Sequence, residues 1–329
     1  MKINKEHPVL VIGAGSIGER HINILVSFGF QNIFVLRRKS SSALRTVKSR
    51  DVNIVKSWRS IKKINFSFAI IANPTSHHAV TAIKCLKNGI HILVEKPLSN
   101  NLKDLHKLKE IAKKNNLLVY VGYMMRFHPY VLKIEKFIQQ GKFGDLVSIE
   151  SLWSEFLPDW HPWENYSESY AANKSLGGGA ALTLSHDLDL TIFLANSGIK
   201  KFFVNGNFKS DLKINVEGAA DILITFKNGI TSNTKLSFHQ VKKERYIKIL
   251  FQKAWVKIDF DKNKMEIFNN KTRKINYYSL KNFNRNELFE KQLQFFINTL
   301  SEKKGMLYRE SNAYISTSSE IINICNEIR

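Results

Sequence analysis

Short apolar runs alternate with segments of helical periodicity in the first part of the chain. Continuous runs of this kind are typical of strands that are buried on both faces of a parallel sheet. The segments between them carry apolar residues at the spacing of helices that pack on a sheet. The pattern predicts βαβ units and a parallel sheet over residues 1–123. The predicted strands are 9–12, 32–36, 66–72, 90–94 and 117–122.

The pattern changes from Leu146 onwards, where strand-like segments follow one another with little helix between them. Asn228-Gly229 predicts a hairpin turn inside this region. We therefore predict a second domain of the α+β class over residues 124–329, with a mostly antiparallel, open-faced sheet. The C-terminal helix is a candidate for packing back on the first domain. The predicted strands are 146–156, 202–208, 219–226, 230–239, 245–251, 254–260 and 264–268, and the predicted helices are 129–140, 186–195, 287–300 and 311–328.

A glycine-rich turn joins the first strand to the first helix. Gly13, Gly15 and Gly18 have the spacing G-x-G-x-x-G, in the strand-to-helix context that dinucleotide binding requires. The glycines allow a tight turn, a close approach of the backbone to a pyrophosphate, and close packing of the helix on the strand. Ser16 and Ile17 open a helix whose N-terminus attracts anions. The alternative is an ordinary strand–helix turn.

The second strand ends in Arg37-Arg38, where an NAD-selective site carries an acidic residue for the ribose 2′-hydroxyl. Guanidinium groups suit a 2′-phosphate, whereas a carboxylate would repel it. The sequence therefore predicts NADP as the cofactor rather than NAD. The alternative is that both arginines only solvate a loop.

Two further strands deliver polar residues to the same edge of the predicted sheet. Asn73-Pro74-Thr75 follows one strand, with Thr75 or Ser76 as the expected cap of a helix that contains His78. Glu95-Lys96-Pro97 follows the next, before a helix that Ser99 or Asn100 would cap. The amine of Lys96 can donate a hydrogen bond to a reacting hydroxyl or carbonyl group. The alternatives are an ordinary strand-end lysine and a structural His78.

The second domain contains two stretches of candidate substrate residues. The loop 157–166 is dense in aromatic and polar side chains, including Trp160 and His161, and could bind a sugar or simply be pinned to the surface. Residues 177–179 are three glycines, and Thr183, His186 and Asp187 or Asp189 follow within two turns. A histidine there can exchange a proton near neutral pH, although a lone helical histidine is often structural.

Composition narrows the partners. The chain has 50 basic and 28 acidic residues, a formal charge of +22, without a dense basic tail or a nucleic-acid motif. This charge predicts a modest attraction to anionic ligands and makes nucleic acid the last-ranked partner. The N-terminus shows no signal-like apolar segment, and no apolar run approaches membrane-spanning length. Two cysteines predict free thiols in the cytoplasm, and no metal site is predicted.

Several motifs together resemble the glucose–fructose oxidoreductase, inositol dehydrogenase and MocA-type (Gfo/Idh/MocA) family. Further stretches similar to the family are 123–129 and 141–144, and the likeness extends over nearly the whole chain. The loop 158–163 is similar to a branch associated with bacterial surface-glycan biosynthesis. The motifs that carry the resemblance are 13–18, 73–78, 95–97 and the three glycines of 177–179 that lead to His186.

The resemblance implies a Rossmann domain, a sheet face that forms homodimers or homotetramers, and nicotinamide-dependent oxidation or reduction of a carbohydrate. It assigns Lys96 and His186 as the catalytic residues. The family often carries an aspartate where this chain has Thr183, and His186 falls one residue early, so that Asp187 is a candidate substitute. The implied substrate contacts are Lys96, Tyr123, Arg126, Trp160, His161, Thr183, His186 and Asp187.

The resulting prediction is an NADP(H)-dependent oxidoreductase that transfers hydride to or from a sugar. The sugar is either free or linked to a phosphate or a nucleotide, and the predicted role is in bacterial surface-glycan biosynthesis. The alternative is a non-catalytic dinucleotide-binding protein, either retired or regulatory, which the loss of the family's aspartate would favour. The predicted cofactor contacts are Gly13, Gly15, Ser16, Ile17, Gly18, Arg37, Arg38, Asn73, Pro74, Thr75, His78, Glu95 and Lys96.

Overall fold

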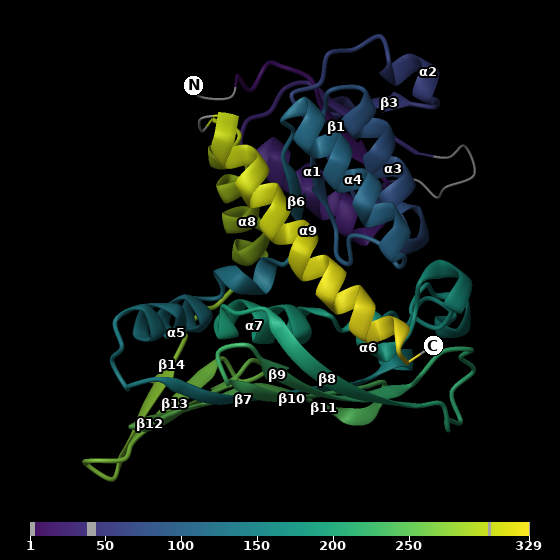
Figure 1. The fold of residues 1–329 in the computed structure, drawn as a ribbon. Helices are drawn as coiled ribbons and strands as arrows, with labels where there is room; N and C mark the ends of the chain where they lie inside the picture. Colours follow the sequence, from purple (N-terminus) through teal and green to yellow (C-terminus); the bar gives the residue numbers. More distant parts are fainter. Residues whose placement is uncertain (1–3, 38–43, 302–303, 329) are drawn as a thin grey trace. The chain divides into compact units, whose positions relative to one another are not determined.

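The computed structural model describes residues 4–37, 44–301 and 304–328 (Figure 1). The chain divides into two compact units. Unit 1 consists of Met1–Tyr123 with Asn286–Ser319, and unit 2 of Met124–Arg285 with Glu320–Arg329. The first boundary therefore follows Tyr123, and a late segment of the chain belongs to the N-terminal unit.

Unit 1 is built on a six-stranded sheet of order β3-β2-β1-β4-β5-β6, in which every pairing is parallel. The central strands are buried on both faces, which is why they show as unbroken apolar runs. The parallel N-terminal sheet is confirmed. The strands are β1 (Val9–Ile12), β2 (Ile33–Leu36), β3 (Asn53–Val55), β4 (Phe68–Ile71), β5 (His91–Val94) and β6 (Val119–Val121); the helices are α1 (Ser16–Ser27), α2 (Trp58–Ile61), α3 (Thr75–Lys87) and α4 (Leu102–Asn115).

Two late helices, α8 (Asn286–Thr299) and most of α9 (Lys304–Asn326), complete unit 1 (Figure 1). Tyr120 of β6 packs its ring against Phe296 of α8 and Tyr314 of α9. The hydroxyl of Ser311 accepts a hydrogen bond from the backbone N–H of Val119. These contacts explain why residues 286–319 group with the N-terminal sheet and not with the rest of the segment 124–329.

Unit 2 is built on an eight-stranded sheet of order β14-β13-β12-β11-β7-β10-β9-β8. All its neighbouring strands are antiparallel except β7 and β10, so the mostly antiparallel sheet is confirmed. Gly229, with a φ of +88°, makes the predicted turn between β9 and β10. The strands are β7 (Leu146–Phe156), β8 (Ile199–Asn207), β9 (Ala219–Phe226), β10 (Thr231–Ser237), β11 (His239–Phe251), β12 (Ala254–Asp259), β13 (Lys264–Asn269) and β14 (Lys274–Ser279).

The two faces of this sheet differ. Helices α5 (Pro129–Gln139), α6 (Ala180–Thr183) and α7 (His186–Ala195) lie on one side of it (Figure 1). The opposite side exposes apolar residues such as Phe203 and Leu223, which are directly paired across β8 and β9. The predicted dimer or tetramer through this face stays a prediction.

Local helix starts differ from the expectation at two positions. Asn101, and not Ser99 or Asn100, caps α4 by accepting a hydrogen bond from the N–H of Lys103. Helix α3 begins at Thr75 itself, after Pro74, whose fixed backbone angle suits a helix entrance and which offers no capping side chain. Neither difference moves His78, which lies in the first turn of α3.

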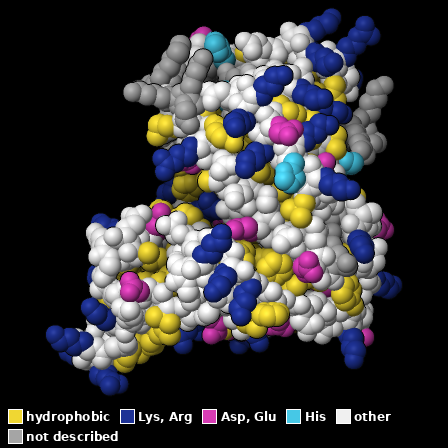
Figure 2. Space-filling view, viewed as in Figure 1, with side chains coloured by type: hydrophobic (Ala, Val, Ile, Leu, Met, Phe, Trp, Pro, Cys, Tyr) yellow, Lys and Arg dark blue, Asp and Glu magenta, His cyan; other side chains and the backbone are white. Residues whose placement is uncertain are grey.

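The surface is basic without a single dense patch on the face drawn in Figure 2. There, Lys and Arg side chains are distributed over both units and are interspersed with Asp and Glu. None of the helices in the described part of the chain is long and apolar enough to span a membrane.

Candidate active site

The glycine-rich turn is tightly packed at two of its three glycines. Gly13 has a φ of +95°, and a Cβ atom there would lie 2.6 Å from the carbonyl carbon of Ala72 at the end of β4. A Cβ atom on Gly18 would overlap the carbonyl oxygen of Gly13. These two glycines are therefore required by the protein's own packing, which holds the start of α1 against the sheet.

Gly15 is different, because no described residue other than Gly15 itself and its two chain neighbours has an atom within 4 Å of the position its Cβ atom would take. It is exposed and precedes α1, and none of the described side chains caps that helix. The N–H groups of a first helical turn have no acceptor within the helix and point toward its N-terminal end, together with the positive end of the helix dipole. The open space at Gly15 fits the pyrophosphate of a dinucleotide, next to the exposed Ser16.

Replacing Gly15 with valine should weaken cofactor binding without unfolding the protein. The backbone there is extended, with φ −78° and ψ −172°, which a β-branched residue adopts readily. We expect NADPH and NADH to bind at least about tenfold more weakly, a loss of roughly 1.4 kcal/mol, with an unchanged melting temperature. Fluorescence titration and a thermal melt measure the two effects. As the matched control, Gly18→Val should lower the melting temperature; a valine-15 variant that binds normally would contradict the assignment.

The end of β2 carries Arg37, which is partly exposed, whereas Arg38 lies outside the described residues. A little further along the chain, residues 45–46 are hydrogen-bonded to Glu19 in the first turn of α1. The carboxylate of Glu19 accepts hydrogen bonds from the N–H groups of Arg45 and Thr46 and from the Thr46 hydroxyl. Burial opposes ionisation of Glu19, but these hydrogen bonds and the charge of Arg45 hold its pKa below the ordinary value. The Glu19 carboxylate therefore holds Arg45 and Thr46 against the start of α1.

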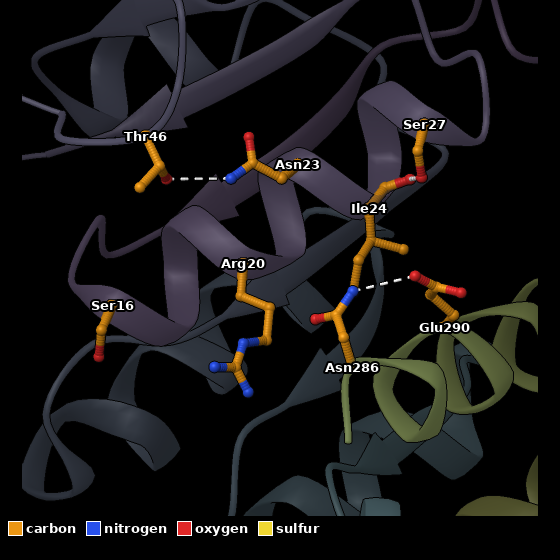
Figure 3. A pocket seen from close by; sticks show the side chains of 8 residues that line it. All are labelled: Ser16, Arg20, Asn23, Ile24, Ser27, Thr46, Asn286 and Glu290. Atoms are coloured by element: carbon orange, nitrogen blue, oxygen red, sulfur yellow. Dashed lines mark hydrogen bonds between the residues drawn. The ribbon is translucent and has the colours of Figure 1, made fainter. Parts of the chain in front are cut away.

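A groove of about 350 Å³ follows the outer side of α1, between that helix, Thr46 and the start of α8 (Figure 3). Arg20 reaches along it, and Asn286 donates a hydrogen bond to Glu290 at its far side. Of the predicted site residues it contains only Ser16. The groove is therefore distinct from the strand-end site that the sequence predicts.

The ends of β4 and β5 are joined by buried polar contacts. Nε2 of His21, on α1, lies 2.7 Å from Oε1 of Glu95. Burial opposes the charge on Glu95, but the hydrogen bond from His21 and the charges of His21, Lys96 and His78 keep its pKa below the ordinary value. The ring nitrogens of His78 lie 2.7 Å from the carbonyl oxygen of Pro97 and 2.6 Å from that of Asn73. Complete burial lowers the pKa of His78, while both carbonyl groups oppose that shift.

Unit 2 places His186 at the first position of α7, only 4% exposed, with its ring stacked on Trp153 of β7. The adjacent Asp187 turns into the sheet. Its carboxylate accepts hydrogen bonds from Arg245, at 2.6 and 3.1 Å, and from the hydroxyl of Ser151. Burial raises the pKa of Asp187, and the charge of Arg245 acts against this rise. These contacts hold the Asp187 carboxylate within unit 2. Its predicted contact with substrate stays a prediction.

Arg126 is also engaged within unit 2. It follows the first boundary in a 3₁₀ turn, Met124–Phe127, and forms a two-pronged ion pair with Asp189 of α7. Its guanidinium group lies 4.8 Å from the ring centre of Phe193. Both acids that follow His186 are therefore paired with arginines.

The remaining predicted residues occupy three places. Tyr123 is 1% exposed at the end of unit 1, and Thr183 is 2% exposed in α6. Trp160 packs edge-on against Phe238, and its buried indole N–H has no hydrogen-bond partner among the described residues. Nδ1 of His161 is likewise buried and has no hydrogen-bond partner in the part of the chain that the structure describes. Polar atoms left in this state are candidates for contact with a ligand.

One buried acid escaped the sequence analysis. Glu217, 1% exposed, accepts a hydrogen bond from the N–H of Ala181, and its carboxylate occupies the space that a side chain on Gly179 would need. It therefore shapes the triple-glycine turn, where Gly179 has a φ of +107°. Within the described residues, no group of three or more His, Cys, Asp or Glu side chains is arranged to hold a metal ion.

Comparisons with known proteins agree on the family over two successive segments of the chain. Residues 8–123 match the model of an oxidoreductase family with an NAD-binding Rossmann fold, and residues 131–257 match the GFO/IDH/MocA C-terminal domain. Myo-inositol 2-dehydrogenase from Thermotoga maritima is 24% identical over 67% of this chain. UDP-N-acetylglucosamine 3-dehydrogenase from Acidithiobacillus ferrooxidans is 26% identical over 60% of it. These alignments span 65% and 57% of the two relatives, less than two thirds of their length.

Solved structures show the same fold over almost the whole chain. A levoglucosan dehydrogenase in complex with NADH has a TM-score of 0.83 at 17% identity, covering 98% of this chain and 96% of the other. The UDP-N-acetylglucosamine 3-dehydrogenase from Acidithiobacillus ferrooxidans has a TM-score of 0.75 at 17% identity, covering 98% of both chains. At such identities the likeness establishes the arrangement of elements and leaves the substrate open.

Proposed function

We propose that this chain, which belongs to the GFO/IDH/MocA family of oxidoreductases, is a nicotinamide-dependent enzyme. It would oxidise a hydroxyl group of a sugar or reduce the corresponding carbonyl group. The observation that carries the proposal is the open turn at Gly15, which the protein's own packing does not require and a dinucleotide pyrophosphate would fill. The bound nicotinamide would supply or accept the hydride. The residues of the chain bind, orient and move protons around that transfer.

Lys96 and His186 are the proposed acid–base groups. Lys96 follows β5 at the carboxyl edge of the parallel sheet, where folds of this class bind ligands. Its ammonium group would polarise the substrate oxygen, and the imidazole of His186 would exchange the hydroxyl proton. Trp160 and His161 would contact the sugar through the buried N–H and Nδ1 atoms for which the described residues provide no hydrogen-bond partner.

A free or nucleotide-linked sugar is the proposed substrate class. Relatives with matching sequence are named for myo-inositol, levoglucosan and UDP-N-acetylglucosamine, which share a ring that carries secondary hydroxyl groups. A role in bacterial surface-glycan biosynthesis is the finer form of the proposal. It is supported by the resemblance of the loop 158–163 to that branch and by the nucleotide-sugar relative.

The experiment is an absorbance assay of the purified protein with NAD⁺ and NADP⁺ against these three compounds, and with the reduced cofactors against their oxidised forms. Turnover of any one of them supports the enzyme reading and ranks the substrate classes. A protein that binds the cofactor tightly but turns over none would favour a non-catalytic dinucleotide-binding protein. Two observations favour the non-catalytic protein as the second candidate. Asp187 is paired with Arg245, and Thr183 stands where the family often carries an aspartate.

NADP is the proposed cofactor, because Arg37 follows β2 at the position where a carboxylate would select NAD. Arg37→Asp should weaken NADP relative to NAD by about 1–3 kcal/mol, the range of charge-assisted hydrogen bonds. Calorimetric titration of the wild type and the variant with both cofactors measures the difference. The exposed Arg59→Asp, on α2, is the matched control and should change neither affinity. Equal losses for NAD and NADP in the Arg37 variant would count against NADP.

A further inference from the structure

Lys96 stands between two residues that are each held by a buried histidine. On one side is Glu95, whose backbone N–H donates to the carbonyl oxygen of Ile71 on β4 at 2.8 Å. On the other side is Pro97, which is buried at the start of the connection to α4. Lys96 itself is partly exposed. Its side chain can therefore meet a ligand while its neighbours cannot move freely.

The first histidine, His21, is fully buried on α1 and lies 2.7 Å from the Glu95 carboxylate. Its ring also packs edge-on against Phe289 of α8. Behind the carboxylate, a Cβ atom on Gly122 would lie only 3.1 Å from Oε2 of Glu95. The Glu95 side chain is thus held between the His21 ring and the backbone of Gly122.

The second histidine, His78, is 2% exposed on α3 and bridges two carbonyl groups. Nδ1 is directed to Pro97, and Nε2 to Asn73 at the exit of β4. A neutral imidazole donates one of these two hydrogen bonds, and the protonated ring donates both. His78 therefore ties the exits of β4 and β5 together at Pro97, the residue after Lys96, whereas His21 holds Glu95, the residue before it.

We propose that His21 and His78 are positioning residues that fix the backbone of Lys96 through Glu95 and Pro97, on the premise of the proposed hydride-transfer function. A displacement of about 1 Å in a reacting group can cost on the order of 10²-fold in rate. Lysine has a long, flexible stem, so the position of its Cα atom is the part that the fold can fix. Two histidines from two different helices fix it from both sides.

The test uses the fact that an Asn amide nitrogen can replace Nδ1 of histidine, and a Gln amide nitrogen can replace Nε2. His78→Asn should keep the contact with Pro97, whereas His78→Gln keeps only the contact with Asn73. In the same way, His21→Gln should keep the contact with Glu95 and His21→Asn should lose it. His91→Asn is the matched control, because His91 accepts a hydrogen bond from the Leu118 N–H at the opposite end of β5.

The readout that needs no substrate is the acetylation rate of Lys96 by acetic anhydride across a range of pH, measured by peptide mass spectrometry against the exposed Lys107. We expect His78→Gln and His21→Asn to change this relative rate by about threefold or more, since amine reactivity follows its surroundings. His78→Asn, His21→Gln and His91→Asn should match the wild type. With a substrate in hand, the first two variants should lose more in kcat than in affinity for NADPH.

Equal behaviour of the Asn and Gln variants at each histidine, or an unchanged Lys96 rate in all of them, would overturn the positioning role. If His78→Gln fails to fold, Gly122→Ala displaces the Glu95 carboxylate without touching either histidine and should change the Lys96 rate. The proposed function fails separately, when the wild type binds neither NADPH nor NADH in a fluorescence titration. The acetylation comparison keeps its meaning in that case.

Discussion

Replacing Lys96 with methionine should lower kcat about 10²- to 10⁴-fold, the contribution typical of a positioned acid–base group. Methionine keeps much of the apolar stem and removes the ammonium group that polarises the substrate oxygen. Lys96 is partly exposed, and the buried contacts around it involve Glu95 and Pro97, so the fold should survive. Steady-state kinetics with the sugar that the wild type turns over fastest, together with NADPH titration, separate turnover from cofactor binding.

The matched control is Lys107→Met, on the exposed face of α4, which removes the same charge from the same unit. It should leave kcat and cofactor affinity unchanged. Normal turnover in Lys96→Met would remove this lysine from the mechanism. A loss of NADPH binding equal to the loss of kcat would instead make Lys96 a cofactor contact without a part in proton transfer.

The buried strands of both sheets follow directly from the pattern of apolar residues, and the two strands that were missed share one property. Both β3 and β14 lie at the edge of their sheets. Every residue of β14 is exposed, and β3 has two exposed residues and one partly exposed residue. An edge strand with little burial needs no apolar alternation, because its backbone hydrogen bonds to a single neighbour define it. The β-branched and aromatic residues of these two strands therefore lack the buried pattern from which the other strands were predicted.

The glycine turn and the strand-end motifs can be predicted because each is local in sequence. The pairings around them cannot, since His21 and Glu95 are 74 residues apart and Asp187 and Arg245 are 58 apart. Helix α7 illustrates the difficulty, because nearly all its residues are buried and no polar stripe shows which way Asp187 points. The available signal was Arg245, which begins a strand pattern of alternating polarity. An arginine whose side chain faces inward at such a position requires a buried partner of opposite charge.

Glu217 was missed for the same reason, because the residue whose shape it complements, Gly179, is distant in sequence. Glu217 precedes β9 by two residues, and no motif in the sequence marks it. Its burial follows from the triple-glycine turn, where the missing side chain of Gly179 leaves the space that the carboxylate fills. Because this complementarity joins distant parts of unit 2, neither partner reveals it alone.

Replacing Asp187 with alanine should destabilise unit 2 by about 3–5 kcal/mol, the range for a buried ion pair that loses one partner. Arg245 is only 5% exposed, and its guanidinium group lies 3.6 Å from the ring centre of Trp153. It would remain buried and uncompensated. Urea denaturation followed by tryptophan fluorescence reports mainly on unit 2, which holds Trp153, Trp160, Trp163 and Trp255.

The double variant Asp187→Leu with Arg245→Met tests the cause of that loss. It removes both charges and retains apolar volume, so it should be considerably more stable than Asp187→Ala. Glu287→Ala breaks an exposed pair with Lys291 and should change stability by less than about 1 kcal/mol. A double variant no better than Asp187→Ala would show that the ion pair itself, and not the stranded arginine, supports the sheet. An undiminished stability in Asp187→Ala would return this carboxylate to the list of groups available for proton transfer beside His186.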